Sequence, residues 1–156
     1  MAHMSDFLEN KLVDFFFRGQ ALGITGATAA AGTGPANLYF GLLTTTPTDS
    51  TVGTEVSGGS YARQGLASTL ANWAGTQAAA STTASSGTTG TTSNNVAVTF
   101  PVPSASWGTI NGMGLYDAVS GGNLLFWVPL AAAKTVNNGD PAPSFAAAAF
   151  TMQLDN

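Results

Sequence analysis

Residues 114–130, GLYDAVSGGNLLFWVPL, restrict the fold of this chain of 156 residues more than any other segment. Two runs of apolar and aromatic residues flank a turn that contains two glycines. Such runs around a glycine turn are typical of a β-hairpin, so we expect antiparallel strands at 109–118 and 123–130. Asp117, just before the turn, either belongs to a functional site or accepts hydrogen bonds from nearby backbone amides, as in an Asx-turn. We favour the Asx-turn.

Other segments of the chain also have the composition of β-strands. Residues 36–47, ANLYFGLLTTTP, are rich in aromatic and β-compatible residues and end at a proline. We expect further strands at 61–67, 94–103 and 144–155, although the alanines of the last segment would also suit a helix. The pattern predicts a mainly β protein of about seven or eight short strands, an antiparallel β-sandwich of jelly-roll type with one N-terminal α-helix.

The predicted helix spans residues 5–19, SDFLENKLVDFFFRG. A serine and an aspartate can cap its first turn, and Gly19 suits its C-terminal end. Its apolar residues recur at helical spacing and form one face, made of Leu8, Leu12, Phe15 and Phe16. We expect this face to cover the sheet of its own domain; the alternative is that the phenylalanines reach a neighbouring subunit.

Two further segments complete the predicted domain organisation. Residues 1–4, MAHM, have the appearance of a cloning remnant, and we expect residues 5–156 to form a single β-sandwich domain. Residues 81–93, STTASSGTTGTTS, are serine or threonine at all but three positions. We expect this segment to be a surface loop whose hydroxyl groups are solvated.

Charged residues make up 8% of the chain, whereas soluble domains usually contain about 25%. The net charge is -4 and the four basic residues are scattered, which argues against nucleic acid as a partner. No apolar run approaches the ~20 residues that span a bilayer, so we expect no membrane partner. The chain has no cysteine and its one histidine is His3, so we expect neither a metal site nor a cofactor.

The distribution of titratable residues also argues against an enzyme. General acid–base catalysis needs two titratable groups in one pocket, and residues 64–116 contain no charged residue. The glycine-rich segments lack the lysine of a P-loop and the spacing of a dinucleotide-binding turn. Trp73, Trp107 and Trp127 could form a stacking platform for sugars, but tryptophans in three separate elements are more often core or interface residues. We therefore expect no catalytic residues.

The charge-poor composition favours a structural subunit that contacts copies of itself or a larger shell. Protein interfaces are depleted in charge at their centres and enriched in aromatic residues. Arg63 is the best single anchor, because a guanidinium among neutral residues can make directed hydrogen bonds to the carbonyl or carboxylate groups of a partner. The predicted interface residues are Leu12, Phe15, Phe16, Tyr61, Arg63, Tyr116 and Trp127.

Three segments in a fixed order resemble a group of small virion proteins of tailed phages. They are DFLENKLVDFFFRG, then NLYFGLLTTTPTDS with GTEVSGGSYARQ, then GLYDAVSGGNLLFWVPL. Members of this group are often labelled tail-fibre proteins, and some are capsid cement or decoration proteins. The resemblance covers most of the chain, with gaps at 20–35 and 68–93. It implies a β-sandwich that binds the outside of the phage head across capsomer junctions, and it brings no catalytic residues.

These observations lead to two hypotheses. In the first, the protein is a capsid cement protein on the outer surface of the head, with the major capsid protein and copies of itself as partners. In the second, it is a tail-fibre or receptor-binding module that contacts glycans of the host surface.

Overall fold

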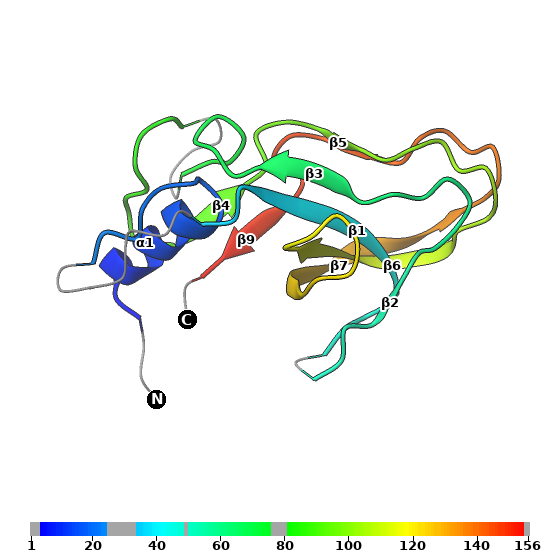
Figure 1. Cartoon of the computed structure of the whole chain (residues 1–156), viewed down its shortest axis with the longest axis horizontal. Coiled ribbons are helices and arrows are strands. Elements are labelled where there is room, and N and C mark those ends of the chain that lie inside the picture. Colours follow the sequence, from blue (N-terminus) through cyan, green and yellow to red (C-terminus); the bar gives the residue numbers. More distant parts are fainter. Residues whose placement is uncertain (1–3, 25–33, 49, 76–80, 155–156) are drawn as a thin grey trace. The chain divides into compact units, whose positions relative to one another are not determined.

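The computed structural model describes residues 4–24, 34–48, 50–75 and 81–154. These residues form one helix and nine strands (Figure 1). The helix is α1 (Asp6–Phe16), and the strands are β1 (Asn37–Thr45), β2 (Thr54–Glu55), β3 (Gln64–Ala67), β4 (Thr91–Ser93), β5 (Val98–Thr99), β6 (Gly108–Tyr116), β7 (Leu124–Val136), β8 (Ser144–Phe145) and β9 (Thr151–Gln153). The predicted fold class, mainly antiparallel β with one N-terminal helix, is confirmed.

The chain groups into two compact units that alternate along the sequence. The first contains Met1–Ala36, Ala67–Ala97 and Phe145–Asn156, and the second contains Asn37–Leu66 and Val98–Ser144. The single domain expected for residues 5–156 remains a prediction. Residues 1–3 of the expected cloning remnant lie outside the described residues.

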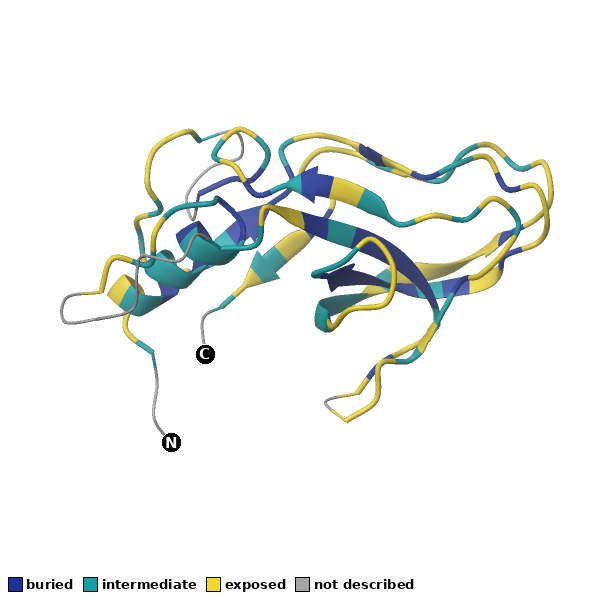
Figure 2. Ribbon diagram, viewed as in Figure 1, coloured by how far each residue is buried: buried dark blue, intermediate teal, exposed yellow. Residues whose placement is uncertain are grey.

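The second unit is built on a sheet of strand order β2-β1-β6-β7, in which β3 also pairs with β1. The β1–β6 register runs from Tyr39 opposite Tyr116 to Leu43 opposite Gly112. Apolar side chains of these two strands are buried, and Figure 2 shows the buried stretch along β1. This core includes Phe40, Leu42, Leu43, Ile110, Met113 and Leu115.

Strands β6 and β7 form the predicted hairpin, and the structure lengthens its second strand to Val136. The antiparallel register is interrupted between Ile110, opposite Lys134, and Gly112, opposite Pro129. The extra residues of β7 therefore form a bulge that begins beside a proline. Proline cannot donate a ladder hydrogen bond, so it fits at a bulge in the strand that ends the sheet order.

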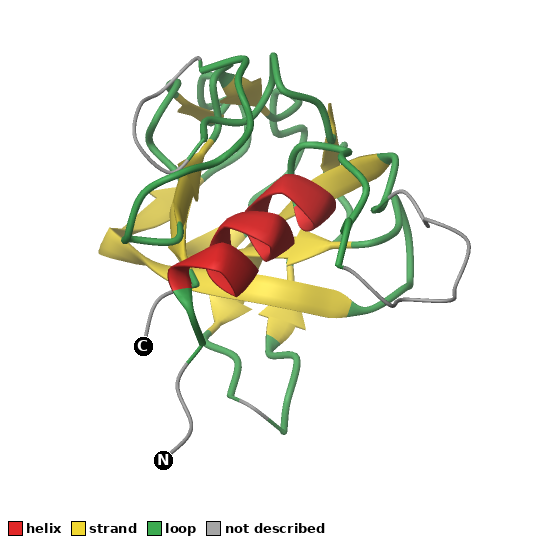
Figure 3. Cartoon of the chain, turned by 90° about the vertical axis from the view of Figure 1, so that its left-hand side faces the viewer, coloured by secondary structure: helices red, strands yellow, loops and turns green. Residues whose placement is uncertain are grey.

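The first unit contains α1, which is drawn in red in Figure 3. The acidic residues of its first turn suit the helix dipole. Among the apolar residues of α1 and its C-terminal cap, Val13 and Phe17 are fully buried, whereas Leu12, Phe15 and Phe16 are only half-buried. Phe17 packs on Trp73, with 5.0 Å between ring centroids. The buried face of the helix is therefore shifted by one residue from the predicted apolar face. In so short a helix, packing against the rest of the unit decides which face is buried.

Two loop and strand predictions need correction. The segment 81–93 was expected to be a surface loop, but its last three residues form β4, which pairs with β9. Thr92 is buried there, and its hydroxyl is satisfied by donating a hydrogen bond of 2.7 Å to the carbonyl of Ala74. The strand expected at 94–103 is limited to β5, since Pro101 and Pro103 follow it.

The alanine-rich segment near the C-terminus is neither a helix nor one continuous strand. It forms β8 and β9 with a turn between them, in which Ala148 has a φ of 61°. Asn94 holds this turn: its side chain donates to the carbonyl of Ala146 and accepts from the N–H of Phe150, and its carbonyl accepts from Ala148. A tertiary contact thus overrides the local preference of the alanines.

Candidate functional site

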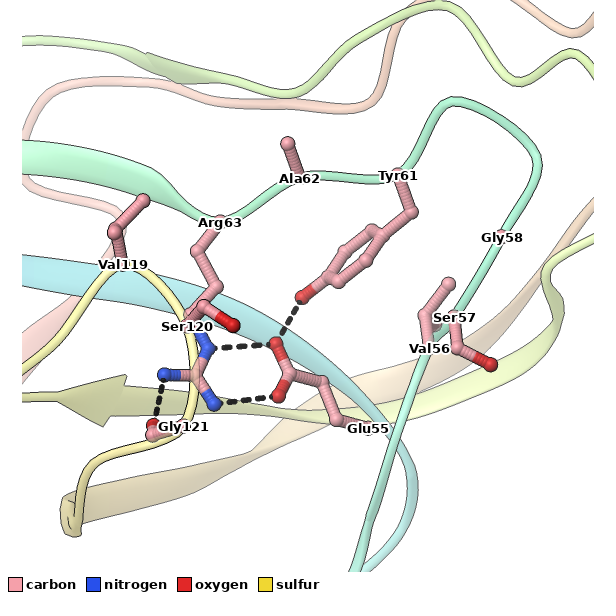
Figure 4. A pocket seen from close by; sticks show the side chains of 10 residues that line it. All are labelled: Glu55, Val56, Ser57, Gly58, Tyr61, Ala62, Arg63, Val119, Ser120 and Gly121. Atoms are coloured by element: carbon pink, nitrogen blue, oxygen red, sulfur yellow. Dashed lines mark hydrogen bonds and ion pairs between the residues drawn. The ribbon is translucent and has the colours of Figure 1, made fainter.

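A cluster of polar side chains lies on the second unit, where β2, the segment before β3 and the β6–β7 turn come together (Figure 4). Arg63 forms a bidentate ion pair with Glu55: its Nε donates to Oε1 at 2.8 Å and its Nη2 donates to Oε2 at 2.6 Å. The hydroxyl of Tyr61 donates to the same Oε1 at 2.8 Å. Bidentate pairs of this kind fix both the distance and the plane of the two side chains.

Arg63 also attaches the hairpin turn to this cluster. Its Nη1 donates to the carbonyls of Ala118 and Gly121, each at 2.7 Å. The guanidinium carbon lies 3.4 Å from the centroid of the Tyr116 ring, a cation–π contact. The hydrogen bond to Glu55 is the main reason why the pKa of Arg63 is raised above its usual value. Arg63 is therefore permanently charged; it holds the turn through the two N–H groups of Nη1 and binds Glu55 through Nε and Nη2.

Tyr61 is fixed from several directions. Its hydroxyl accepts the N–H of Leu42 at 2.8 Å. Its ring is nearly parallel to Phe100, with centroids 6.1 Å apart, and nearly perpendicular to Trp107 at 5.4 Å. Burial is the main cause that raises the pKa of Tyr61 far above its usual value, and burial also raises the pKa of Tyr116. Both phenols are therefore neutral at physiological pH.

The cluster depends on a glycine in β1. A Cβ atom at Gly41 would lie 2.8 Å from Glu55 Oε1 and 2.8 Å from an edge carbon of the Tyr116 ring. Both distances are shorter than real Cβ contacts, so any larger residue would displace the carboxylate or the ring. Glycine at this position allows the cluster to lie directly against the strand.

The cluster forms one wall of a cavity of about 380 Å³. Arg63 and Glu55 are the charged residues of the lining, and they compensate each other. Apolar surface comes from Val56, Ala62 and Val119, of which Val119 is 63% exposed. Ser57, Gly58, Ser120 and Gly121 complete the lining together with Tyr61.

Asp117 is a structural residue of the hairpin. Its two carboxylate oxygens accept the backbone N–H and the side-chain amide of Asn123, each at 2.7 Å. The side-chain hydrogen bond from Asn123 is the main cause that lowers the pKa of Asp117, and the backbone hydrogen bond lowers it further. The prediction that Asp117 accepts a backbone amide at the bend is confirmed, and the residue is not part of the cavity lining.

Comparison with known proteins identifies the family. Residues 3–153 match the family model described as podophage GP4 fiber I protein gp80. The chain belongs to this family. No curated protein matches the sequence. This fibre-family chain is therefore a structural protein of a phage virion, and of the two sequence-based hypotheses the family description agrees better with the tail fibre than with the capsid cement protein.

The structure of the fibre-family chain brings together three of the seven predicted interface residues. Tyr61 and Arg63 lie in the cavity wall and Tyr116 stacks beneath the guanidinium. Trp127 is half-buried on β7 and lines a separate cavity of the same unit. Leu12, Phe15 and Phe16 belong to the other unit. Whether any of the seven contacts a partner stays a prediction, although Arg63 uses most of its hydrogen-bonding capacity inside the unit.

Sequence reasoning missed two ion pairs of this fibre-family chain. Glu55 was not among the predicted site residues, because a separation of eight positions across a glycine-containing loop gives no regular signal. Arg18 was not among the predicted site residues either, yet it is fully buried and paired with Asp14 at 2.7 Å. The i, i+4 spacing of Asp14 and Arg18 is the signal that could have indicated this pair.

The described residues contain no group of three or more histidine, cysteine, aspartate or glutamate side chains that could hold a metal ion. No helix in the described part of the chain has the length and apolar character that crossing a membrane requires.

Proposed function

We propose that this protein is a non-enzymatic component of a phage tail fibre and that it contacts glycans on the host surface. The observation that carries the proposal is the match of residues 3–153 to the fibre family. The state of the charged residues in the cavity supports the non-enzymatic part. Glu55 accepts three hydrogen bonds from Arg63 and Tyr61, so its carboxylate is occupied by structural bonds rather than presented as a free base.

The low charge of the chain supports contact with a neutral or weakly charged surface. The chain has four Lys and Arg residues, and two of them, Arg18 and Arg63, form internal ion pairs. A protein with so few available cations has little long-range attraction for polyanions. Glycan contact through hydrogen bonds and apolar surface needs no such attraction.

The experiment that tests the location is immunogold labelling of intact virions with an antibody against this chain. Label confined to the tail supports the fibre. Binding of the purified chain to host cells, compared with cells stripped of surface polysaccharide, tests the glycan contact. Equal binding to both kinds of cell would contradict that part of the proposal.

A second candidate function is capsid cement on the outer surface of the head, with the major capsid protein and copies of the chain as partners. The half-buried apolar residues of β7, from Leu124 to Val128, favour an interface of this kind, because they offer aromatic and aliphatic surface without charge. Gold label distributed over the whole head would support this function. Co-sedimentation of the purified chain with heads that lack it would support it independently.

A further inference from the structure

The cavity beside Arg63 has the features of a ligand site. We infer that it binds a neutral, hydroxyl-rich saccharide unit. This inference rests on the proposed glycan contact and assigns that contact to a particular place on the chain. A cavity of about 380 Å³ lies at the lower end of the range for small-ligand sites. The contact would therefore involve a short piece of a glycan rather than a long segment.

The charge of the cavity favours a neutral ligand. Arg63 and Glu55 carry opposite charges and lie 2.6 Å apart at their closest atoms. The other lining residues are neutral, and the pKa of Tyr61 is raised by burial, so this wall carries no net charge. An anionic ligand would have to compete with Glu55 for the guanidinium and would gain little from the field of the site.

The unused hydrogen-bonding groups of the lining match hydroxyl groups. Arg63 uses four of its five N–H groups, which leaves one N–H on Nη2. Glu55 Oε2 accepts one hydrogen bond, which leaves acceptor capacity on that oxygen. Within the described residues, the Ser57 and Ser120 hydroxyls have no hydrogen-bond partner. A saccharide hydroxyl both donates and accepts, so it can use adjacent donor and acceptor groups of this kind.

The geometry of the wall is set before any ligand arrives. Arg63 is held by Glu55, by the carbonyls of the turn and by the Tyr116 ring, and Tyr61 is held by Phe100 and Trp107. A preorganised polar group loses little conformational entropy when it binds. The exposed Val119 adds an apolar surface at the edge, which suits the C–H face of a sugar ring.

The test measures binding of the purified full chain to oligosaccharides released from the surface polysaccharide of the host. The oligosaccharides are separated into neutral and acidic fractions, and calorimetry gives the dissociation constant for each. The blocking variant is Ser120→Phe, which fills the cavity from the exposed turn without removing a member of the ion pair. The matched control is Ser50→Phe, at an exposed serine that lines the separate cavity near Trp127. Circular dichroism and thermal unfolding establish that both variants are folded.

We expect the neutral fraction to bind and Ser120→Phe to raise its dissociation constant by about tenfold or more, whereas Ser50→Phe changes it by less than about twofold. Binding that both variants retain would place the glycan contact elsewhere and overturn the assignment of the cavity, while the proposed function would stand. Binding of the acidic fraction alone would overturn the neutral-ligand argument. A wild-type chain that binds neither fraction would overturn the inference and the glycan contact together.

Discussion

Arg18 is the side chain whose removal we expect to affect the first unit most. It is fully buried, and its Nη1 donates to Asp14 at 2.7 Å and to the Ser85 hydroxyl at 2.8 Å. Its Nη2 donates to the carbonyl of Ser81 at 2.9 Å and to that of Thr83. The guanidinium thus joins the end of α1 to the serine- and threonine-rich segment.

The variant Arg18→Met removes the charge and keeps much of the apolar volume. Asp14 would then remain buried, with the amide of Ser85 as a remaining donor at 2.9 Å. Removal of one partner of a buried ion pair costs about 3–5 kcal/mol. Domains are stable by only about 5–15 kcal/mol, so the variant should lose about a fifth or more of its stability. For a chain of this length the unfolding midpoint should fall by roughly 6–20 °C.

The assay is equilibrium unfolding in urea, followed by tryptophan fluorescence and by circular dichroism. Trp73 packs on Phe17 in the same unit and should report the change. The double variant Asp14→Leu, Arg18→Met should recover at least half of the loss, because it leaves no buried carboxylate without its cation. The matched control is Lys134→Met, at an exposed lysine, which should change stability by less than about 0.5 kcal/mol. A loss below about 1 kcal/mol for Arg18→Met would refute the reasoning, since it would mean that water replaces the guanidinium at no great cost.

Three further predictions concern the second unit. Burial raises the pKa of Tyr61, so the contribution of the neutral Tyr61 side chain to stability is complete below pH about 10 and is lost as the pH rises above that value. The urea midpoint should therefore fall less steeply with rising pH for Tyr61→Phe than for the wild type, and parallel curves would contradict this. Hydrogen bonds lower the pKa of Asp117, so the contribution of its carboxylate to stability is complete above pH about 4 and is lost below that value. The thermal midpoints of the wild type and of Asp117→Asn should converge as the pH falls, and a constant difference would count against this. Gly121→Ala and Gly122→Ala both place alanine at positive φ, which costs about 1–2 kcal/mol. A Cβ at Gly122 would also lie 2.3 Å from Asp117 Oδ1, whereas a Cβ at Gly121 would meet nothing within 4 Å. Gly122→Ala should therefore be the less stable variant in urea unfolding, and equal midpoints would show that the turn relaxes.

The hairpin was predictable because its information is local. Apolar residues on both sides of a glycine turn specify two paired strands, and Asp117 at the bend has a standard hydrogen-bonding role there. The helix at 5–19 was predictable for the same reason, although its buried face was not. Local periodicity identifies an amphipathic helix, but which of two adjacent apolar rows is fully buried depends on contacts such as that of Phe17 with Trp73.

The ion pair of Arg63 with Glu55 was not predictable, because it depends on how the loop between them reverses. Gly58 and Gly59 have φ values of 74° and 57°, and Ser60 follows with 64°. Three successive residues in the left-handed region return the chain so that Arg63 faces Glu55. The alanines near residue 148 illustrate the same limit, since their turn is imposed by Asn94, more than fifty positions earlier.

The two buried or half-buried arginines perform the same task in their separate units. Arg18 pairs with Asp14 and donates to the carbonyls of Ser81 and Thr83. Arg63 pairs with Glu55 and donates to two carbonyls of the β6–β7 turn. In each unit one guanidinium fixes an irregular segment by its backbone, and one carboxylate neutralises it.

This use of charge explains why a chain with so few ionic residues can still hold long loops in place. Small residues such as serine, threonine and glycine provide few side-chain contacts, so their segments need another source of order. A guanidinium can supply it, because it donates in several directions at once to carbonyl groups that any residue offers. Both arginines are thereby paired inside the units, so the surface available to a partner has few basic groups among its hydroxyl, amide and apolar groups. Such a surface binds mainly through shape and hydrogen bonds, and for that reason its contacts should depend far less on ionic strength than those of a highly charged protein.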